Sequence, residues 1–497
     1  MSSVSLYQEY TTKMQKIADV KYASAVLQWD QETYLPSKGS HFRGRQIATL
    51  SEIAHQQFTD EKLGAILNEL NGQDLNKKEK KNVQLTLEDY ARNKKFTSDF
   101  VRKMSETTNR SFHAWIQARK ENSFAVFQQP LDELIQLKKQ EADMLGYEQH
   151  PYNALMSEFD KGLTVNIVDK IFTNLKLPLK ELLNTIEGKT QVDDTFLRQH
   201  FNKDDQWKLG LEILKRMHFD FEAGRQDISE HPFTTNFNNS DVRVTTRVDE
   251  NDLGNMVWSC IHEGGHALYE QGLPGEEYGL PLGEYCSLSI HESQSRLWEN
   301  SVGRSRNFWA YNLPLLQTIF PQQFSNISLE QFYKGINKVA PSLIRTEADE
   351  ITYHFHVMIR YEIEKMLIEG SISTKDIPAY WNEHYQKYLG ITVPDDKRGC
   401  LQDVHWSHGS FGYFATYSLG TMYGAQMYAA IEKERINTGN EIAAGNNQHV
   451  LDWLRKNIHQ YGKLYTSEEL CTRATGEPLN PQYFIEYATR KIADIYN

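Results

Sequence analysis

Residues 348–370 read ADEITYHFHVMIRYEIEKMLIEG, and this stretch predicts a helix. Gly370 is typical of a helix end. The chain of 497 residues has only 14 prolines and is rich in side chains that lose little rotamer freedom in a helix. We therefore expect a mostly α-helical fold. The apolar positions recur at steps of three, four and one, as one helix face requires: Ala348, Ile351, Phe355, Met358, Ile359, Ile363, Met366 and Leu367.

Residues 231–252, HPFTTNFNNSDVRVTTRVDEND, break the helical pattern. Apolar and polar side chains alternate from Val242 to Val248, and 238–240 supply turn residues, which predicts a β-hairpin. We expect a helical front lobe at 1–225 and a second lobe with the hairpin and the motifs below at 226–497. No Pro/Gly/Ser-rich linker separates them, so we predict one continuous body with an approximate boundary.

Composition and charge exclude several classes of protein. The net charge of −12 opposes binding to nucleic acid or to anionic membranes. The sequence has no apolar run of the length that a membrane-spanning helix needs and no signal-peptide pattern at its start. The four cysteines lack C-x-x-C spacing, which argues against a thiolate metal site and a disulfide scaffold. We expect a cytoplasmic protein.

Residues 261–268, IHEGGHAL, contain the pattern H-E-x-x-H. His262 and His266 are four residues apart, so one helix face presents both imidazoles to a single tetrahedral Zn²⁺, with Glu263 beside the metal. Two glycines inside a helix cost about 1 kcal/mol each relative to Ala, which indicates close approach to the backbone there. The alternative is a helix with two histidines that bind no metal. Preceding apolar positions support a buried helix: Leu253, Met256, Val257, Cys260 and Ile261.

A catalytic zinc needs three protein ligands and an open water position. The pattern H-E-x-x-H-x-x-G-x-x-H is excluded, because Tyr269 and Gly272 replace its Gly and final His. Glu292, in a helix-compatible stretch 26 residues beyond His266, is the candidate third ligand. Spacing alone leaves three alternatives open: His291, Glu284 and Glu299.

Six ordered blocks extend the pattern over most of the chain: HPF at 231–233, DVRVT at 241–245, HEGGH at 262–266, HESQSR at 291–296, IRTEAD at 344–349 and GCLQDVHW at 399–406. In these blocks the chain resembles the carboxypeptidase Taq family of zinc metallocarboxypeptidases. The resemblance implies a two-lobed helical body with a deep central groove, one zinc per subunit and commonly a homodimer. It also implies the gluzincin ligand set His262, His266 and Glu292, and release of single C-terminal residues from short peptides with broad specificity.

The expected chemistry starts from zinc, which lowers the pKa of a bound water to about 7 and polarises the scissile carbonyl. Glu263 is the natural general base. The stretch HWSHGSFGYFATYSLG at 405–420 offers donors to the carbonyl oxygen. A tyrosine taken alone is more often a core residue, but with the resemblance we favour Tyr417 over Tyr413, and His408 over His405.

A carboxypeptidase must also hold the substrate's terminal carboxylate, for which a bidentate guanidinium is suited. Arg345 is our candidate, and Asp349 would then orient a ligand histidine. The alternative is a simple ion pair between the two, since they are four residues apart. His231 and Arg243 of the hairpin are further candidates, because an exposed strand edge can align an extended peptide. The hairpin is equally well explained as a structural flap.

Imidazole and carboxylate ligands also accept Co²⁺ or Mn²⁺ in place of zinc. The leading hypothesis is a zinc-dependent carboxypeptidase. The alternatives are an endo-oligopeptidase that uses the same centre and a non-enzymatic helical binding protein with a structural metal.

Overall fold

The structure is a computed structural model that describes residues 3–496. Most of these residues are helical, and the described part of the chain contains one three-stranded β-sheet. The predicted fold class, mostly α with one small sheet, is thereby confirmed. Within residues 3–496, no helix is long and apolar enough to cross a membrane.

The chain divides into two compact units, each built from three separate segments. The first comprises Met1–Lys94, Asp193–Ile336 and Tyr423–Leu479, and the second comprises Lys95–Val192, Asn337–Met422 and Asn480–Asn497. Residue 225, the expected boundary, lies inside the first unit, because the strand that contains it pairs within the sheet of that unit. The expected front lobe is therefore shared between both units.

In the first unit, the long helix α1 packs against α2 and α3. Its buried side chains, from Leu6 to Ile17, form an apolar cluster with α3 and α4. The helices of this unit are α1 (Ser3–Thr33), α2 (Ser40–Phe58), α3 (Glu61–Asn71), α4 (Lys77–Lys94), α9 (Lys203–Arg216), α10 (Leu253–Glu270), α11 (Leu288–Arg296), α12 (Arg306–Ile319), α13 (Pro321–Phe324), α14 (Leu329–Ile336), α18 (Thr438–Ala443), α19 (Gln448–Asn457) and α20 (Ser467–Thr475).

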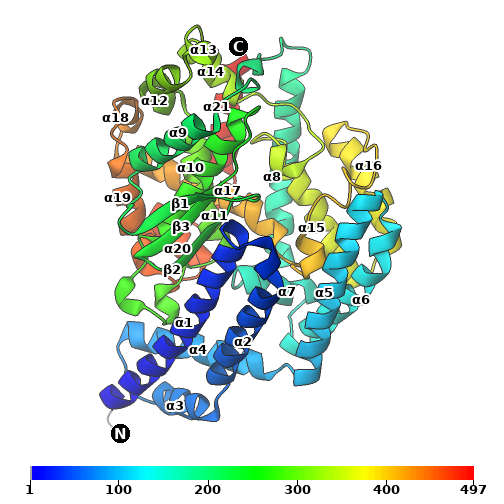
Figure 1. Cartoon of the computed structure of the whole chain (residues 1–497), viewed down its shortest axis with the longest axis vertical. Helices are drawn as coiled ribbons and strands as arrows, with labels where there is room; N and C mark the ends of the chain where they lie inside the picture. The colour runs from blue at the N-terminus through cyan, green and yellow to red at the C-terminus, as the bar shows by residue number, and fades with distance from the viewer. Residues whose placement is uncertain (1–2, 497) are drawn as a thin grey trace. The chain divides into compact units, whose positions relative to one another are not determined.

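The sheet of the first unit has the strand order β1-β3-β2, with β1 at Gly224–Ile228, β2 at Thr234–Asn238 and β3 at Asp241–Thr246. The hairpin prediction is confirmed, since β2 and β3 are antiparallel neighbours. The sequence GRQDI did not predict β1, because it lacks alternation and pairs in parallel with β3. The sheet packs on α10 (Figure 1), so the hairpin lies against the helix that carries HEGGH.

In the second unit, α15 begins at Tyr353 rather than at 348, because Asp349 caps the preceding turn. It ends at Gly370, whose φ is +89°, as predicted. The helix is buried on its polar as well as its apolar positions. The helices of this unit are α5 (Ser98–Glu121), α6 (Ala125–Leu145), α7 (Pro151–Phe159), α8 (Val165–Ile186), α15 (Tyr353–Glu369), α16 (Ile377–Leu389) and α21 (Gln482–Tyr496), and α17 (Phe414–Glu434) starts here and ends in the first unit.

Candidate metal centre

The sequence HEGGH lies on α10, a helix that is buried along most of its length. Asp252 begins the helix, because its carboxylate accepts a hydrogen bond of 2.8 Å from the amide of Gly254. His262 and His266 stand one turn apart, with their ring centroids separated by 4.9 Å. Their side chains are 19% and 13% exposed, so an ion can reach both imidazoles from solvent.

The two glycines of the motif allow close packing on both sides of α10. A Cβ atom on Gly265 would stand 2.7 Å from the carbonyl oxygen of Gln294 and from Cα of Ser295, which are backbone atoms of α11. A Cβ atom on Gly264 would stand 2.8 Å from a methyl group of Leu214. The predicted close approach is therefore found, and it brings α10 and α11 into backbone contact.

Glu292 lies on α11 and faces both histidines. Its Oε2 is 3.5 Å from Nε2 of His266 and 3.7 Å from Nε2 of His262, and one ligand atom of each residue lies within 4.8 Å of the others. These separations exceed the usual 2.7 to 3.2 Å of a hydrogen bond. Ligands about 2.0 to 2.2 Å from a zinc ion at tetrahedral angles stand roughly 3.3 to 3.6 Å apart. The donor set therefore fits a divalent ion.

The other candidates for a third ligand make different contacts. Glu284 forms a salt bridge of 3.0 Å with a lysine. Glu299, in the π-helical segment Leu297–Gly303 that continues α11, places Oε2 2.9 Å from Nδ1 of His262. His291 places its Nδ1 2.6 Å from Nδ1 of His266. Glu299 and His291 thus contact the ring nitrogens that face away from Glu292.

The charges around Glu292 and His266 suit metal ligands. Burial alone would raise the pKa of Glu292, but Arg296 and the histidines outweigh it and hold the pKa well below its usual range. Burial and the neighbouring His291 lower the pKa of His266 to about 3. Burial also lowers the pKa of His262, but Glu292 and Glu299 together outweigh burial, so the net pKa of His262 is raised. An ionised carboxylate and a neutral imidazole are the forms that bind metals.

Glu263 follows His262 on α10 but is not one of the three clustered groups. Its side chain is buried, and its Oε2 accepts a hydrogen bond of 2.6 Å from the hydroxyl of Thr234 on β2. Burial raises the pKa of Glu263 by more than its neighbours lower it. A carboxylate with a raised pKa is a better proton acceptor near neutral pH.

Arg345 lies in the second unit, in the short 3-10 turn Arg345–Glu347, and is only 6% exposed. Its Nε donates to Asp403 at 2.9 Å and its Nη1 to the hydroxyl of Tyr353 at 3.2 Å. The guanidinium lies 4.8 Å from the ring of Tyr417. The alternative ion pair with Asp349 is not formed, because that carboxylate accepts hydrogen bonds from the amides of the next turn.

His405, rather than His408, lies beside the two predicted tyrosines. Nε2 of His405 is 3.2 Å from the hydroxyl of Tyr417, and its ring centroid is 5.4 Å from that of Tyr413. His408 is exposed and packs on a phenylalanine of α5. The chain turns at Gly409, with φ of +74°, directly after His408. The structure therefore brings His405, and not His408, next to the two tyrosines.

Comparison with known proteins identifies the family. The sequence profile described as "Carboxypeptidase Taq (M32) metallopeptidase" matches residues 9–492. The chain belongs to this family. Carboxypeptidase 1 of Bacillus subtilis is 37% identical over 491 residues, which cover 98% of both chains.

Two solved structures are similar to this chain over nearly its whole length. One, described as "The Structure of CHT", is 58% identical with a TM-score of 0.97 and covers 98% of this chain and 99% of that one. The M32 carboxypeptidase from Deinococcus radiodurans R1 is 35% identical, also with a TM-score of 0.97, and covers 99% of each chain. This carboxypeptidase Taq family member is a metallocarboxypeptidase, a divalent-metal-dependent hydrolase of peptides. The predicted family and enzyme class are confirmed.

The hairpin residues predicted to contact substrate have different surroundings. His231 is exposed, and its carbonyl accepts a hydrogen bond of 2.6 Å from Ser229. Arg243 forms two 2.9 Å hydrogen bonds with Asp241 and lies 4.3 Å from the ring of Trp29. Because β3 is the central strand, β2 provides the strand edge on the hairpin side. Asp241 of the same strand thus neutralises the charge of Arg243. The substrate contacts of His231 and Arg243 stay predictions.

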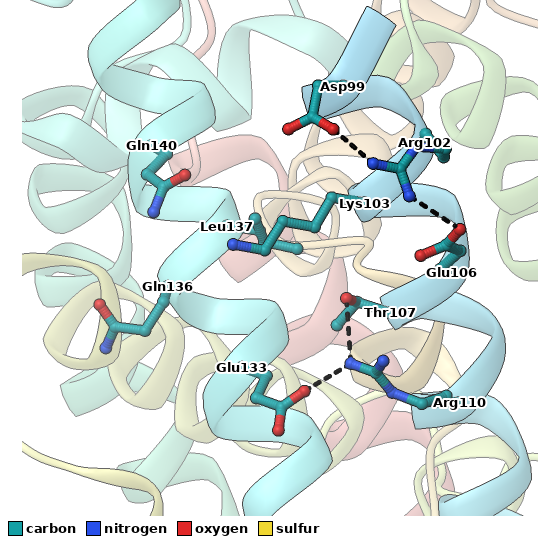
Figure 2. Close-up of a pocket in the computed structure, with 10 residues that line it drawn as sticks. All are labelled: Asp99, Arg102, Lys103, Glu106, Thr107, Arg110, Glu133, Gln136, Leu137 and Gln140. Atoms are coloured by element: carbon teal, nitrogen blue, oxygen red, sulfur yellow. Dashed lines mark hydrogen bonds and ion pairs between the residues drawn. The ribbon is translucent and has the colours of Figure 1, made fainter.

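A hollow of about 530 Å³ between α5 and α6 contains none of the predicted site residues. Figure 2 shows that its arginines are paired within it: Arg102 with Asp99 and Glu106, and Arg110 with Glu133. The acidic groups thus compensate these positive charges. The hollow is lined by Asp99, Arg102, Lys103, Glu106, Thr107, Arg110, Glu133, Gln136, Leu137 and Gln140.

Sequence reasoning did not assign the supporting contacts of the ligands and the base, although it named Glu299 as a possible ligand. Glu299 lies seven residues after Glu292, and Glu270 lies four after His266, so helical periodicity would have placed each on the same face as a ligand. Glu299, and not Asp349, is the carboxylate in contact with a ligand histidine. No spacing rule signals Thr234, because it approaches α10 from a separate strand.

Proposed function

We propose that this carboxypeptidase uses zinc held by His262, His266 and Glu292 to release single C-terminal residues from peptides. The observation that carries the proposal is the arrangement of two imidazole Nε2 atoms and one carboxylate Oε2, spaced like zinc ligands and partly open to solvent. Broad specificity rests on the resemblance to the family. Zinc is preferred over Co²⁺ and Mn²⁺ because two imidazoles and one carboxylate form the usual ligand set of a hydrolytic zinc site.

Bound zinc supplies Lewis-acid chemistry, since it lowers the pKa of water toward about 7 and polarises a carbonyl. Glu263 accepts the proton of the attacking water and passes it to the leaving amine. Two features support this role: the buried carboxylate has a raised pKa, and the hydroxyl of Thr234 holds one of its oxygens. The other oxygen is left to exchange the proton.

Arg345 binds the terminal carboxylate of the substrate in this proposal. Its Nε and Nη1 are held by Asp403 and Tyr353, while Nη2 makes no hydrogen bond to a described residue. Such a fixed guanidinium is pre-organised for a carboxylate. We also propose that Tyr417, with Tyr413 as the alternative, donates to the carbonyl oxygen of the scissile bond.

His405 is the histidine that supports this role, because it contacts the hydroxyl of Tyr417. His408 and the hairpin residues His231 and Arg243 stay predictions, as do the homodimer and the cytoplasmic location.

The test compares the wild-type chain with Glu263→Gln and with Glu276→Gln, a matched change at an exposed glutamate. Metal analysis should find the same zinc content in all three proteins. Turnover of an N-blocked dipeptide with a free C-terminus should fall about 10²- to 10⁴-fold in Glu263→Gln alone. Amidation of the substrate's C-terminus should abolish its cleavage. Full activity of Glu263→Gln, or rapid cleavage of the amide, would contradict the proposal.

A further inference from the structure

We propose that Glu270 and His291 are positioning residues that hold His266 in the one tautomer and orientation able to bind the metal. The proposal rests on the ligand role of His266 stated above. It concerns a hydrogen-bonded chain behind the ligand, which runs from His266 through His291 to Glu270 and ends at Asn236 on β2.

The positions of protons in this chain follow from its geometry. His266 directs Nε2 toward Glu292, so this nitrogen must keep its lone pair to bind a metal. The ring proton then lies on Nδ1, which is 2.6 Å from Nδ1 of His291. His291 must accept there, so its own proton lies on Nε2, 2.7 Å from Oε1 of Glu270. Each histidine therefore has one allowed tautomer, and the carboxylate ends the chain as an acceptor.

The outer end of the chain is held in place. The amide nitrogen of Asn236 donates to Oε2 of Glu270 at 2.6 Å, and Glu270 is only 4% exposed. The imidazole of His291 lies between the rings of Tyr285 and Tyr269, with centroid distances of 4.8 and 5.5 Å. These contacts prevent His291 from rotating away from His266.

The two ligand histidines are thus supported in different ways. Nδ1 of His262 donates directly to the carboxylate of Glu299 at 2.9 Å, whereas Nδ1 of His266 is linked to the carboxylate of Glu270 through a second imidazole. If His291 could not accept this hydrogen bond, Nδ1–H of His266 would be a buried donor without a partner. The ring would then gain by rotating or by moving its proton to Nε2, and either change removes the ligand.

The experiment measures the zinc dissociation constant by competition with a chromophoric chelator. His291→Leu removes the acceptor, so we expect affinity to fall about 10- to 100-fold. His291→Asn restores an acceptor near the position of Nδ1 and should recover most of the loss. Glu270→Gln should lower zinc affinity less than His291→Leu does. It removes the negative charge, but the side-chain amide of Asn236 can reorient and keep the hydrogen-bonded chain intact. Thermal unfolding of each metal-free variant checks its fold.

His459→Leu is the matched control. His459 is a fully buried histidine that, like His291, lies beside Tyr269, but its Nε2 bonds to Gln294 and not to a ligand. The zinc affinity of the His459→Leu variant should equal that of the wild type. Wild-type affinity in His291→Leu, an equal loss in His459→Leu, or no recovery in His291→Asn would overturn the proposal. A wild-type chain that binds zinc but releases no C-terminal residue would refute the proposed function and leave this inference standing, because its readout is metal affinity.

Discussion

The hydrogen bond from Thr234 to Glu263 gives a sharp prediction for Thr234→Val. Valine keeps the shape of threonine but removes the hydroxyl that donates to Oε2 at 2.6 Å. A hydrogen bond to a charged group is worth about 1.5 to 3 kcal/mol. Because 1.36 kcal/mol corresponds to a factor of ten in rate, kcat should fall about 10- to 100-fold if this bond positions the base.

Steady-state kinetics on the blocked dipeptide provide the assay. KM and zinc content should not change, because Thr234 contacts neither the metal ligands nor a proposed substrate group. Thr234→Ser keeps the hydroxyl and should restore kcat. The bond to Thr234 also lowers the pKa of Glu263, so its loss should move the acid limb of the pH–rate profile to higher pH.

Thr235→Val is the control for Thr234→Val. It makes the same change one residue along β2, where the side chain points to the other face of the sheet. Equal kcat values for Thr234→Val and the wild type would refute the positioning role. A similar loss in Thr235→Val would assign the effect to the strand as a whole.

Three further outcomes are expected. Burial raises the pKa of Glu364 from 4.5 to about 7, so its favourable contribution to stability is present below pH 4.5 and is lost as pH rises through 7. Urea titrations should therefore show that, between pH 4.5 and pH 7, the free energy of unfolding falls ~3 kcal/mol more in the wild type than in Glu364→Gln. Equal losses in the two proteins would contradict the burial argument. Gly265→Ala should weaken zinc binding and lower Tm more than Gly264→Ala, because it meets backbone rather than a flexible methyl group; calorimetry and zinc titration compare the two. Arg345→Lys should raise KM at least tenfold for substrates with a free C-terminus, since an ammonium cannot bind a carboxylate in bidentate fashion, and unchanged KM would exclude the proposed contact.

Local patterns predicted much of this molecule. The apolar period of α10, the alternation in the hairpin and the end of α15 at Gly370 all depend on neighbours within a few residues. The close approach at Gly265 was also predicted, because a glycine inside a helix has a known cost. These features need no knowledge of how distant segments meet.

Sequence spacing was least informative where distant segments meet. The ion pair of Arg345 with Asp349 was an alternative that spacing allowed, but the helix begins only at Tyr353, and Arg345 pairs with Asp403 instead. Spacing also did not indicate that His405, and not His408, contacts the hydroxyl of Tyr417; the role of His408 stays a prediction. Sequence spacing gives no measure of such contacts.

The π-helical segment Leu297–Gly303 constrains the number of residues between Glu292 and Glu299. It sets the rotation between Glu292, which faces one side of the histidine pair, and Glu299, which reaches Nδ1 of His262. Deleting one residue between them would turn Glu299 by roughly a quarter of a turn relative to Glu292. The number of residues in this stretch is thus as constrained as their identity, and insertions or deletions among relatives should fall in the loops outside 288–303.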